Sequence, residues 1–300
     1  MQTAQTLANA RPTSSLQFVP TGRALGVEVR GIDIRKPLDP ATAAALRAAW
    51  HENLVLIVRE QPMTHDEHLA FTRYFGEPEI ARLYVTMSAD KTIDNDKPPM
   101  FSVISNIVVD GKPIGSLGSG EAVWHTDSSL VETPPAAGLL HAVEVPPAGG
   151  STWVLNMYAA LDTLPADLRQ QIEGRQILHP ATHRSDGKPS KGFENVTDIT
   201  KVPGTKHPII RTHPDTGRKA LYLGRRINAS VVGMPIPESE YLLDALWAHA
   251  TQEKFTYRHD WKVGDLLMWD NRCVMHRRDP FDPNSRRLMY RTQTKGTKPF

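Results

Sequence analysis

The sequence contains the stretch Val123-Trp-His-Thr-Asp-Ser-Ser129, which directs the interpretation of the whole chain. In an extended strand, residues i and i+2 point to the same face. His125 and Asp127 would then present an imidazole nitrogen and a carboxylate oxygen side by side. A His-x-Asp pair also arises by chance in a chain of this length, so its context decides its meaning.

Two other pairs compete with this one. His213-Pro-Asp215 falls at the tip of a predicted hairpin, where Pro disrupts strand pairing and Asp-Thr-Gly favours a turn, so we interpret it as structural. His65-Asp-Glu67 falls in the first turn of a helix, where residues i and i+2 do not share a face. His125 follows a flexible Gly-rich segment and precedes an apolar strand. The simplest alternative for it is a strand histidine satisfied by the neighbouring aspartate.

The segment near the C-terminus adds a third candidate ligand. It reads Trp269-Asp-Asn-Arg-Cys-Val-Met-His276, and His276 ends a predicted apolar strand. A distant histidine together with a His-x-Asp pair makes the 2-His-1-carboxylate triad of non-haem Fe(II) oxygenases.

A strand with inward-facing arginines follows His276. Arg287, Met289 and Arg291 share one face of this predicted strand. Two inward arginines are costly unless they meet anions. A dicarboxylate co-substrate and an anionic substrate would provide them. The alternatives are an exposed basic strand edge or structural salt bridges.

The composition excludes several classes of protein. The 300 residues are 40% hydrophobic and 23% charged, as in ordinary globular proteins. A net charge of +2, spread along the chain, predicts no nucleic-acid or membrane-surface partner. No apolar run reaches the roughly 18 residues of a membrane span. Cys273 is the only cysteine, which fits the cytoplasm and removes any Cys-based zinc site.

Short strands and turns dominate the pattern along the chain. We expect a strand pair at 16–34, a hairpin at 209–223, and single strands at 54–58, 101–109, 136–145, 151–155, 255–261, 266–275 and 286–294. We expect helices at 40–51, 64–75, 157–174 (broken at Pro165) and 237–251. This order predicts a mostly β fold with helical insertions, in the form of a sandwich or jelly roll.

The chain is expected to form one domain, residues 16–300, behind a flexible N-terminal tail, residues 1–15. The tail has only Arg11 as a basic residue and no apolar segment, which argues against a targeting peptide. Polar segments near 84–122 and 184–208 lack a regular pattern, and we interpret them as lid-like loops.

At these residues the chain resembles the Fe(II)/2-oxoglutarate-dependent dioxygenases of the taurine and chlorophenoxyacetate dioxygenase family (TauD/TfdA). The resemblance runs from about Leu16 to Thr294 and is closer to the chlorophenoxyacetate branch. The motifs that carry it are Phe75-Gly-Glu77, Trp124-His-Thr-Asp127, Pro147-Ala-Gly-Gly-Ser-Thr152, Thr212-His-Pro-Asp-Thr-Gly-Arg-Lys219, Trp269-Asp-Asn-Arg272 and the spacing from His276 to Arg287 and Arg291.

The resemblance implies a fold and a set of site residues. The fold would be a double-stranded β-helix, which is a cupin-like jelly roll. Iron would be held by His125, Asp127 and His276. The distal carboxylate of 2-oxoglutarate would meet Arg287 and the hydroxyl of Thr152. The primary substrate would meet Arg291 and Tyr84.

The resemblance also implies the reaction. With Fe(II) and O2, 2-oxoglutarate would be converted to succinate and CO2 while a C–H bond of a small anionic substrate is hydroxylated. A hydroxylated carbon that bears oxygen or sulfur would collapse, cleaving an ether or a C–S bond. The taurine enzymes carry a substrate-binding histidine where this chain has Ala81, which favours an aryloxyalkanoate-like or other carboxylate over taurine.

Several alternatives remain open from the sequence. The same site could serve a sulfonate or alkyl sulfate, or it could belong to a non-catalytic, cupin-like module that binds a metal or anion. A hydrolytic zinc enzyme is a third option, but it needs a general base beside the metal-bound water, and the sequence identifies none. The family resemblance further implies a homo-oligomer, either a dimer or a tetramer.

Overall fold

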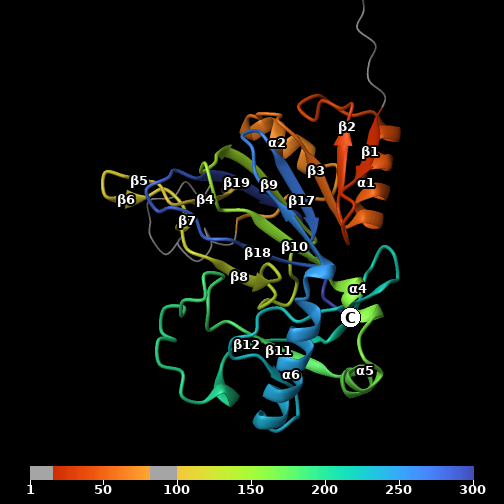
Figure 1. The fold of residues 1–300 in the computed structure, drawn as a ribbon, viewed down its shortest axis with the longest axis vertical. Helices are drawn as coiled ribbons and strands as arrows, with labels where there is room; N and C mark the ends of the chain where they lie inside the picture. The colour runs from red at the N-terminus through yellow and green to blue at the C-terminus, as the bar shows by residue number, and fades with distance from the viewer. Residues whose placement is uncertain (1–15, 82–99) are drawn as a thin grey trace, which may run out of the picture.

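The computed structural model describes residues 16–81 and 100–300, and Figure 1 shows their arrangement. The predicted tail, residues 1–15, lies outside the described residues, as do residues 82–99 of the first lid-like segment. Two β-sheets occupy the centre of the molecule, and helices and smaller sheets surround them. The expectation of a mostly β fold with helical insertions is confirmed.

The two central sheets form the predicted jelly roll, or double-stranded β-helix. The large sheet has the order β1-β2-β3-β17-β9-β19-β4-β7, and the small sheet has the order β16-β10-β18-β8. The large-sheet strands are β1 (Gln17–Pro20), β2 (Val27–Arg30), β3 (Val55–Val58), β4 (Ser102–Ser105), β7 (Ser116–Leu117), β9 (Ala137–Glu144), β17 (Leu266–Asp270) and β19 (Leu288–Gln293). The small-sheet strands are β8 (Ala122–His125), β10 (Thr152–Asn156), β16 (Thr256–His259) and β18 (Val274–Arg278).

Two helices cover the outer face of the large sheet. Helix α1 (Pro40–Asn53) begins at Asp39, whose carboxylate accepts two backbone N–H bonds, and α2 (His65–Thr72) begins with the predicted capping box. Both helices pack their apolar side chains into one buried cluster with the sheet; it includes Leu46, Trp50, Phe71, Leu56 and Met268. The opposite face of the sheet is therefore left to meet the small sheet.

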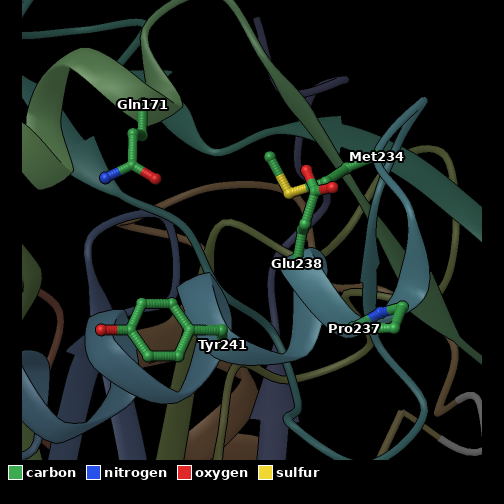
Figure 2. Close-up of a pocket in the computed structure, with 5 residues that line it drawn as sticks. All are labelled: Gln171, Met234, Pro237, Glu238 and Tyr241. Carbon is green, nitrogen blue, oxygen red and sulfur yellow. The ribbon is translucent and has the colours of Figure 1, made fainter.

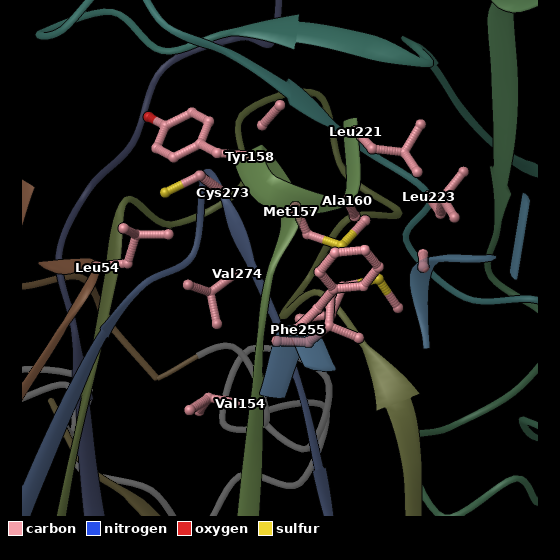
Figure 3. Close-up of a cluster of buried hydrophobic side chains, with 14 of the residues drawn as sticks. Leu54, Val154, Met157, Tyr158, Ala160, Leu221, Leu223, Phe255, Cys273 and Val274 are labelled. Atoms are coloured by element: carbon pink, nitrogen blue, oxygen red, sulfur yellow. The ribbon is translucent and has the colours of Figure 1, made fainter. Parts of the chain in front are cut away.

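A third layer packs beneath the small sheet. It contains α4 (Met157–Asp162), α5 (Ala166–Ile172), α6 (Ile236–Ala250), a sheet of β11 (Gln176–Pro180), β12 (Gly204–Pro208) and β15 (Ser230–Val231), and the predicted hairpin of β13 (Ile210–Thr212) and β14 (Lys219–Leu221). Figure 3 shows side chains of α4, β14 and β18 meeting in the main hydrophobic cluster, among them Met157, Leu221 and Val274. This layer supports the small sheet on the face that points away from the large sheet.

The single strand predicted over 266–275 is wrong. β17 ends at Asp270 in the large sheet, and β18 begins at Val274 in the small sheet. Asn271 makes the corner, with its side chain donating to the carbonyls of Asp127 and Pro135. The residues stay apolar through this corner, so hydrophobicity alone does not reveal the change of sheet. As a result, His276 lies inside β18 and not at its end.

Two smaller boundaries also differ from the prediction. The strand expected at 101–109 is split into β4 and β5 (Val108–Val109), because the Asn106 side chain accepts the N–H of Arg287 and donates to the carbonyl of Ser285. Helix α2 ends at Thr72, earlier than the expected Phe75.

The described parts of the two lid-like segments contain regular structure. Within 100–122, β4 and β7 belong to the large sheet, and β5 pairs with β6 (Lys112–Pro113). The segment 184–208 contains the short helix η1 (Ile199–Lys201) and ends in β12, which was predicted as loop. Their role as lids stays a prediction. Across residues 16–81 and 100–300, no helix has the length and apolar character needed to span a membrane.

Candidate active site

The three predicted metal ligands converge between the two central sheets. His125 at the end of β8 and His276 in β18 are cross-strand partners, and their ring centroids lie 4.2 Å apart. Nε2 of His125 is 3.5 Å from Oδ1 of Asp127, and Nε2 of His276 is 3.9 Å from the same oxygen. All three side chains are buried, and their candidate ligand atoms lie within 4.8 Å of one another. One ion could contact all three.

The protonation states of these residues suit a divalent metal. Nδ1 of His125 lies 2.7 Å from the carbonyl oxygen of Val123, which can only accept, so Nδ1 carries the hydrogen and Nε2 keeps its lone pair. Burial lowers the pKa of His276 well below its usual value, which keeps this imidazole neutral. Burial raises the pKa of Asp127, but Arg291 and His276 outweigh it and hold that pKa well below normal. Two imidazole nitrogens and one carboxylate fit Fe(II).

Asp127 is fixed from several directions. Its backbone N–H donates to the amide oxygen of Asn271 at 2.9 Å, and the Asn271 side chain donates back to its carbonyl at 3.0 Å. Nη1 of Arg291 donates to both carboxylate oxygens, at 2.9 and 2.8 Å, and Gln293 donates to Oδ2 at 3.2 Å. Arg291, predicted to bind substrate, is therefore placed against a candidate metal ligand.

A second buried cationic region lies beside the triad. Arg287 is 1% exposed, and its Nε and Nη1 have no hydrogen-bond partner among the described residues. Burial and the nearby charge of Arg278 lower the pKa of Arg287 to about 9. Thr152 lies at the start of β10, where its hydroxyl oxygen accepts from Trp261 Nε1 at 3.0 Å. Its hydroxyl hydrogen therefore remains available to an incoming anion.

A glycine turn makes room for this region. Gly150 has φ +69°, a left-handed conformation that strains other residues, and a Cβ added there would lie 3.5 Å from Nε of Arg287 and 3.4 Å from the Phe281 ring. The turn leads directly into Thr152. Gly150 therefore places no side chain against the guanidinium of Arg287.

A pocket of about 310 Å³ opens beside β8 and contains an arginine that the sequence did not single out. Arg225 donates to the His183 carbonyl and to Ser185 Oγ, and its buried Nε has no partner among the described residues. Burial lowers the pKa of Arg225, and the Asp127 charge opposes this shift. The pocket is lined by Glu121, Val123, Trp124, His183, Arg184, Arg225, Arg226, Ile227 and Trp247. Tyr84 lies outside the described residues.

The competing His-x-Asp pair is structural, as predicted. Nδ1 of His213 accepts the backbone N–H groups of Asp215 and Thr216, so Nε2 carries the hydrogen and donates to Asp270 at 2.9 Å. Arg272 donates to both oxygens of Asp270. Cys273 lies close to His213 and Asp270, but both partners already use their ligand atoms in hydrogen bonds.

A separate pocket between α5 and α6 contains none of the candidate site residues. Figure 2 shows its lining: Gln171, Met234, Pro237, Glu238 and Tyr241. It offers a single carboxylate, that of Glu238, and the phenol of Tyr241 is its only other titratable group. The chemistry of the fold is therefore concentrated between the central sheets.

Comparisons with known proteins agree with this geometry. The model of the family "Taurine catabolism dioxygenase TauD, TfdA family" matches residues 17–293. The chain is 37% identical over 288 residues to the alpha-ketoglutarate-dependent 2,4-dichlorophenoxyacetate dioxygenase of Cupriavidus pinatubonensis, covering 90% of this chain and 94% of that protein. It is 30% identical over 297 residues to the (S)-phenoxypropionate/alpha-ketoglutarate-dioxygenase of Delftia acidovorans, covering 94% and 96%.

A solved structure matches the fold as well. The crystal structure of AAD-2 in complex with Mn(II) and N-oxalylglycine superposes with a TM-score of 0.76 at 33% sequence identity, covering 95% of this chain and 99% of that one. The family's reaction uses Fe(II), 2-oxoglutarate and O2. The chain therefore belongs to the TauD, TfdA family and is a 2-oxoglutarate-dependent non-haem iron dioxygenase.

Proposed function

We propose that this dioxygenase hydroxylates a small organic acid of the aryloxyalkanoate type, with release of succinate and CO2. The observation that supports it is the convergence of His125, Asp127 and His276. Near them lie Arg225 and Arg287, whose buried N–H groups have no acidic hydrogen-bond partner among the described residues. His125, Asp127 and His276 would hold Fe(II). Fe(II), when bound, supplies the oxidation by O2 in which one oxygen atom enters the substrate and the other enters succinate.

The residues of the chain bind and orient the reactants. Arg287 and Thr152 would bind the distal carboxylate of 2-oxoglutarate. The Nε and Nη1 groups of Arg287 and the hydroxyl hydrogen of Thr152 are donors that no described residue uses. Arg291 would steady Asp127 and share its charge with the anionic group of the substrate. These groups position their partners and transfer no proton.

The pocket beside β8 supports an aryl acid as substrate. Trp124, Ile227 and Trp247 offer apolar and aromatic surface, and Arg225 offers an unpaired buried N–H group. Arg184 and Arg226 are already ion-paired, with Asp186 and with Glu240 and Asp244. We propose that the carboxylate of the substrate lies toward Arg225 and Arg291, with Tyr84 as a further contact. An arene bearing an acidic side chain matches this surface.

A succinate assay over a panel of acids tests the proposal. The iron-loaded protein, with ascorbate, is offered phenoxyacetates, phenoxypropionates, taurine and alkyl sulfates. We expect substrate-dependent succinate with an aryloxyalkanoate and cleavage of its ether bond. Asp127→Asn should lower the rate at least about 100-fold, whereas Asp260→Asn on the surface should not. Greater turnover of sulfates would move the assignment to that branch, and the absence of 2-oxoglutarate turnover would refute it.

Two broader expectations belong to the same proposal. The enzyme is proposed to act in the cytoplasm, which suits its one free, buried cysteine, Cys273. It is also proposed to form a homodimer or homotetramer, as the family resemblance implies. Light scattering on the purified full chain would reveal its mass in solution.

A further inference from the structure

Arg278 shares the interior face of the small sheet with residues of the proposed site. It lies two residues after His276 on β18, so both side chains point to the same face. Its direct cross-strand partner on β10 is Thr152. Arg278 is 5% exposed. The sequence did not mark it, because the arginines at 277 and 278 resemble a surface pair.

Arg278 and Arg287 approach the same ring. The guanidinium carbon of Arg278 is 5.4 Å from the centroid of Phe281, and that of Arg287 is 5.9 Å from it. Phe281 is held in place by backbone hydrogen bonding of its N–H to Ser119 and by its bridge to Gly149. A cation from β18 and a cation from the residue just before β19 therefore approach one fixed aromatic side chain.

Neither cation has a carboxylate partner among the described residues. Arg278 donates through Nη2 to the carbonyls of Leu117 and Gly120, and no acceptor meets its buried Nε and Nη1. Arg287 also has an unpaired Nε and Nη1. Asp279, the nearest acid in sequence, is engaged with Arg277 and Trp153. Neighbouring buried cations with unused donors need an anion between them.

We propose that Arg278 is a second anchor for the distal carboxylate of 2-oxoglutarate, opposite Arg287; this inference rests on the proposed function. A carboxylate offers about four lone-pair sites, enough for donors from two guanidinium groups and the Thr152 hydroxyl. The arrangement makes the site selective for keto acids that carry a second negative charge. Its contacts to Leu117 and Gly120 hold Arg278 in this position.

Anaerobic calorimetry on the Mn(II)-loaded full chain tests this role without turnover. The two ligands are 2-oxoglutarate and 2-oxopentanoate, which keeps the keto-acid end but has a methyl group where the distal carboxylate would be. We expect Arg278→Met to weaken 2-oxoglutarate binding by roughly 10- to 100-fold, the effect of losing charge-assisted hydrogen bonds. Binding of 2-oxopentanoate should change less than about twofold. Arg278→Lys should recover part of the affinity for 2-oxoglutarate.

Arg277→Met is the matched control. Arg277 is the adjacent arginine on the other face of β18 and is ion-paired with Asp279, so its loss should leave both affinities unchanged. If Arg278→Met lost affinity equally for both ligands, or for neither, the inference would be overturned. Arg278 would then only hold the 117–120 segment in place through its hydrogen bonds. Unchanged Mn(II) affinity confirms that the variants are folded. A wild-type chain that binds neither keto acid would refute the proposed function instead.

Discussion

Asn271 shows how a single side chain without any metal-binding role can govern the metal site. Its amide accepts from Asp127 N–H and donates to the carbonyls of Asp127 and Pro135. Asn271→Ala should weaken Mn(II) binding by about 10- to 100-fold, the usual effect of losing a group that orients a ligand. Calorimetry measures it, with Asn284→Ala in an exposed turn as the control. Equal Mn(II) affinity in Asn271→Ala and wild type would contradict this reading.

At the residue scale, the sequence predicted the convergence of His125, Asp127 and His276, and the structure brings them together. The spacing of these residues is a local property that can be read from sequence, but β8 ends at His125, so Asp127 lies in the turn after it and not on the predicted extended strand. Arg278 and Arg225 escaped notice because their meaning depends on partners from other elements. Thr152 was found only through the family resemblance, since a lone threonine at a strand start carries no chemical pattern.

At the scale of elements, the pairing of β9 with β17 shapes the site through a glycine. Gly138 lies opposite Trp269, and a Cβ added there would come within 2.5 Å of the indole. The indole in turn packs 4.6 Å from the ring of His276. Gly138→Ala should destabilise the fold by about 1–3 kcal/mol through overpacking, and it should also weaken Mn(II) binding.

Denaturant unfolding and Mn(II) calorimetry together measure the effect of Gly138→Ala. Gly120→Ala is the control, because an added Cβ there meets nothing within 4 Å. A loss of stability without any loss of Mn(II) affinity would show that Trp269 does not position His276.

The corner between β17 and β18 depends on a buried carboxylate. Asp270 accepts from Arg272 and His213, and burial, which raises its pKa, is outweighed by Arg272, so its pKa lies far below normal. Asp270→Asn should cost about 3 kcal/mol at pH 7, since it leaves the buried Arg272 with only the half-exposed Asp215 as an acidic partner. A depressed folded pKa stabilises above the unfolded pKa of about 3.9 and loses that stability as pH falls toward the folded value.

The pH dependence of unfolding in the metal-free chain checks this assignment. The difference between wild type and Asp270→Asn should stay constant from about pH 7 to pH 5 and narrow only below about pH 4. Asp162→Asn, at an exposed helix end, should have the same free energy of unfolding as wild type both at pH 7 and below pH 4. A gap that already closes between pH 7 and pH 5 would mean that another group controls the corner.

Elements were predicted well where periodicity is strong and poorly where tertiary contacts decide. Helix α1 follows its Asp39 cap, α6 follows its apolar spacing and the acidic Glu238 of its first turn, and the hairpin of β13 and β14 follows its turn residues. The strand at 266–275 was predicted as one piece because its hydrophobicity continues through the corner at Asn271. β11 and β15 were missed, since each pairs with strands that are remote in sequence.

At the scale of the whole molecule, the site joins the two sheets of the jelly roll. His125, His276 and Arg278 come from the small sheet, whereas Arg291 comes from β19 of the large sheet and holds Asp127 between them. A ligand that binds groups from both sheets therefore stabilises the packing of the two sheets against each other. The hydrophobic pattern predicted two packed layers, but only the structure shows that the cationic groups of both face one centre.

Binding of metal and keto acid should consequently raise the melting temperature of the full chain. At a hundredfold excess over the dissociation constant, a ligand that binds only the folded state adds about 2.7 kcal/mol, which corresponds to roughly 4 °C for a chain of this size. Differential scanning calorimetry under nitrogen, with Mn(II) and 2-oxoglutarate, measures the shift. Asp127→Asn should shift far less at the same ligand concentrations, because it lacks the carboxylate that joins the metal to Arg291. An equal shift in both proteins would place the stabilising site away from the space between the two sheets.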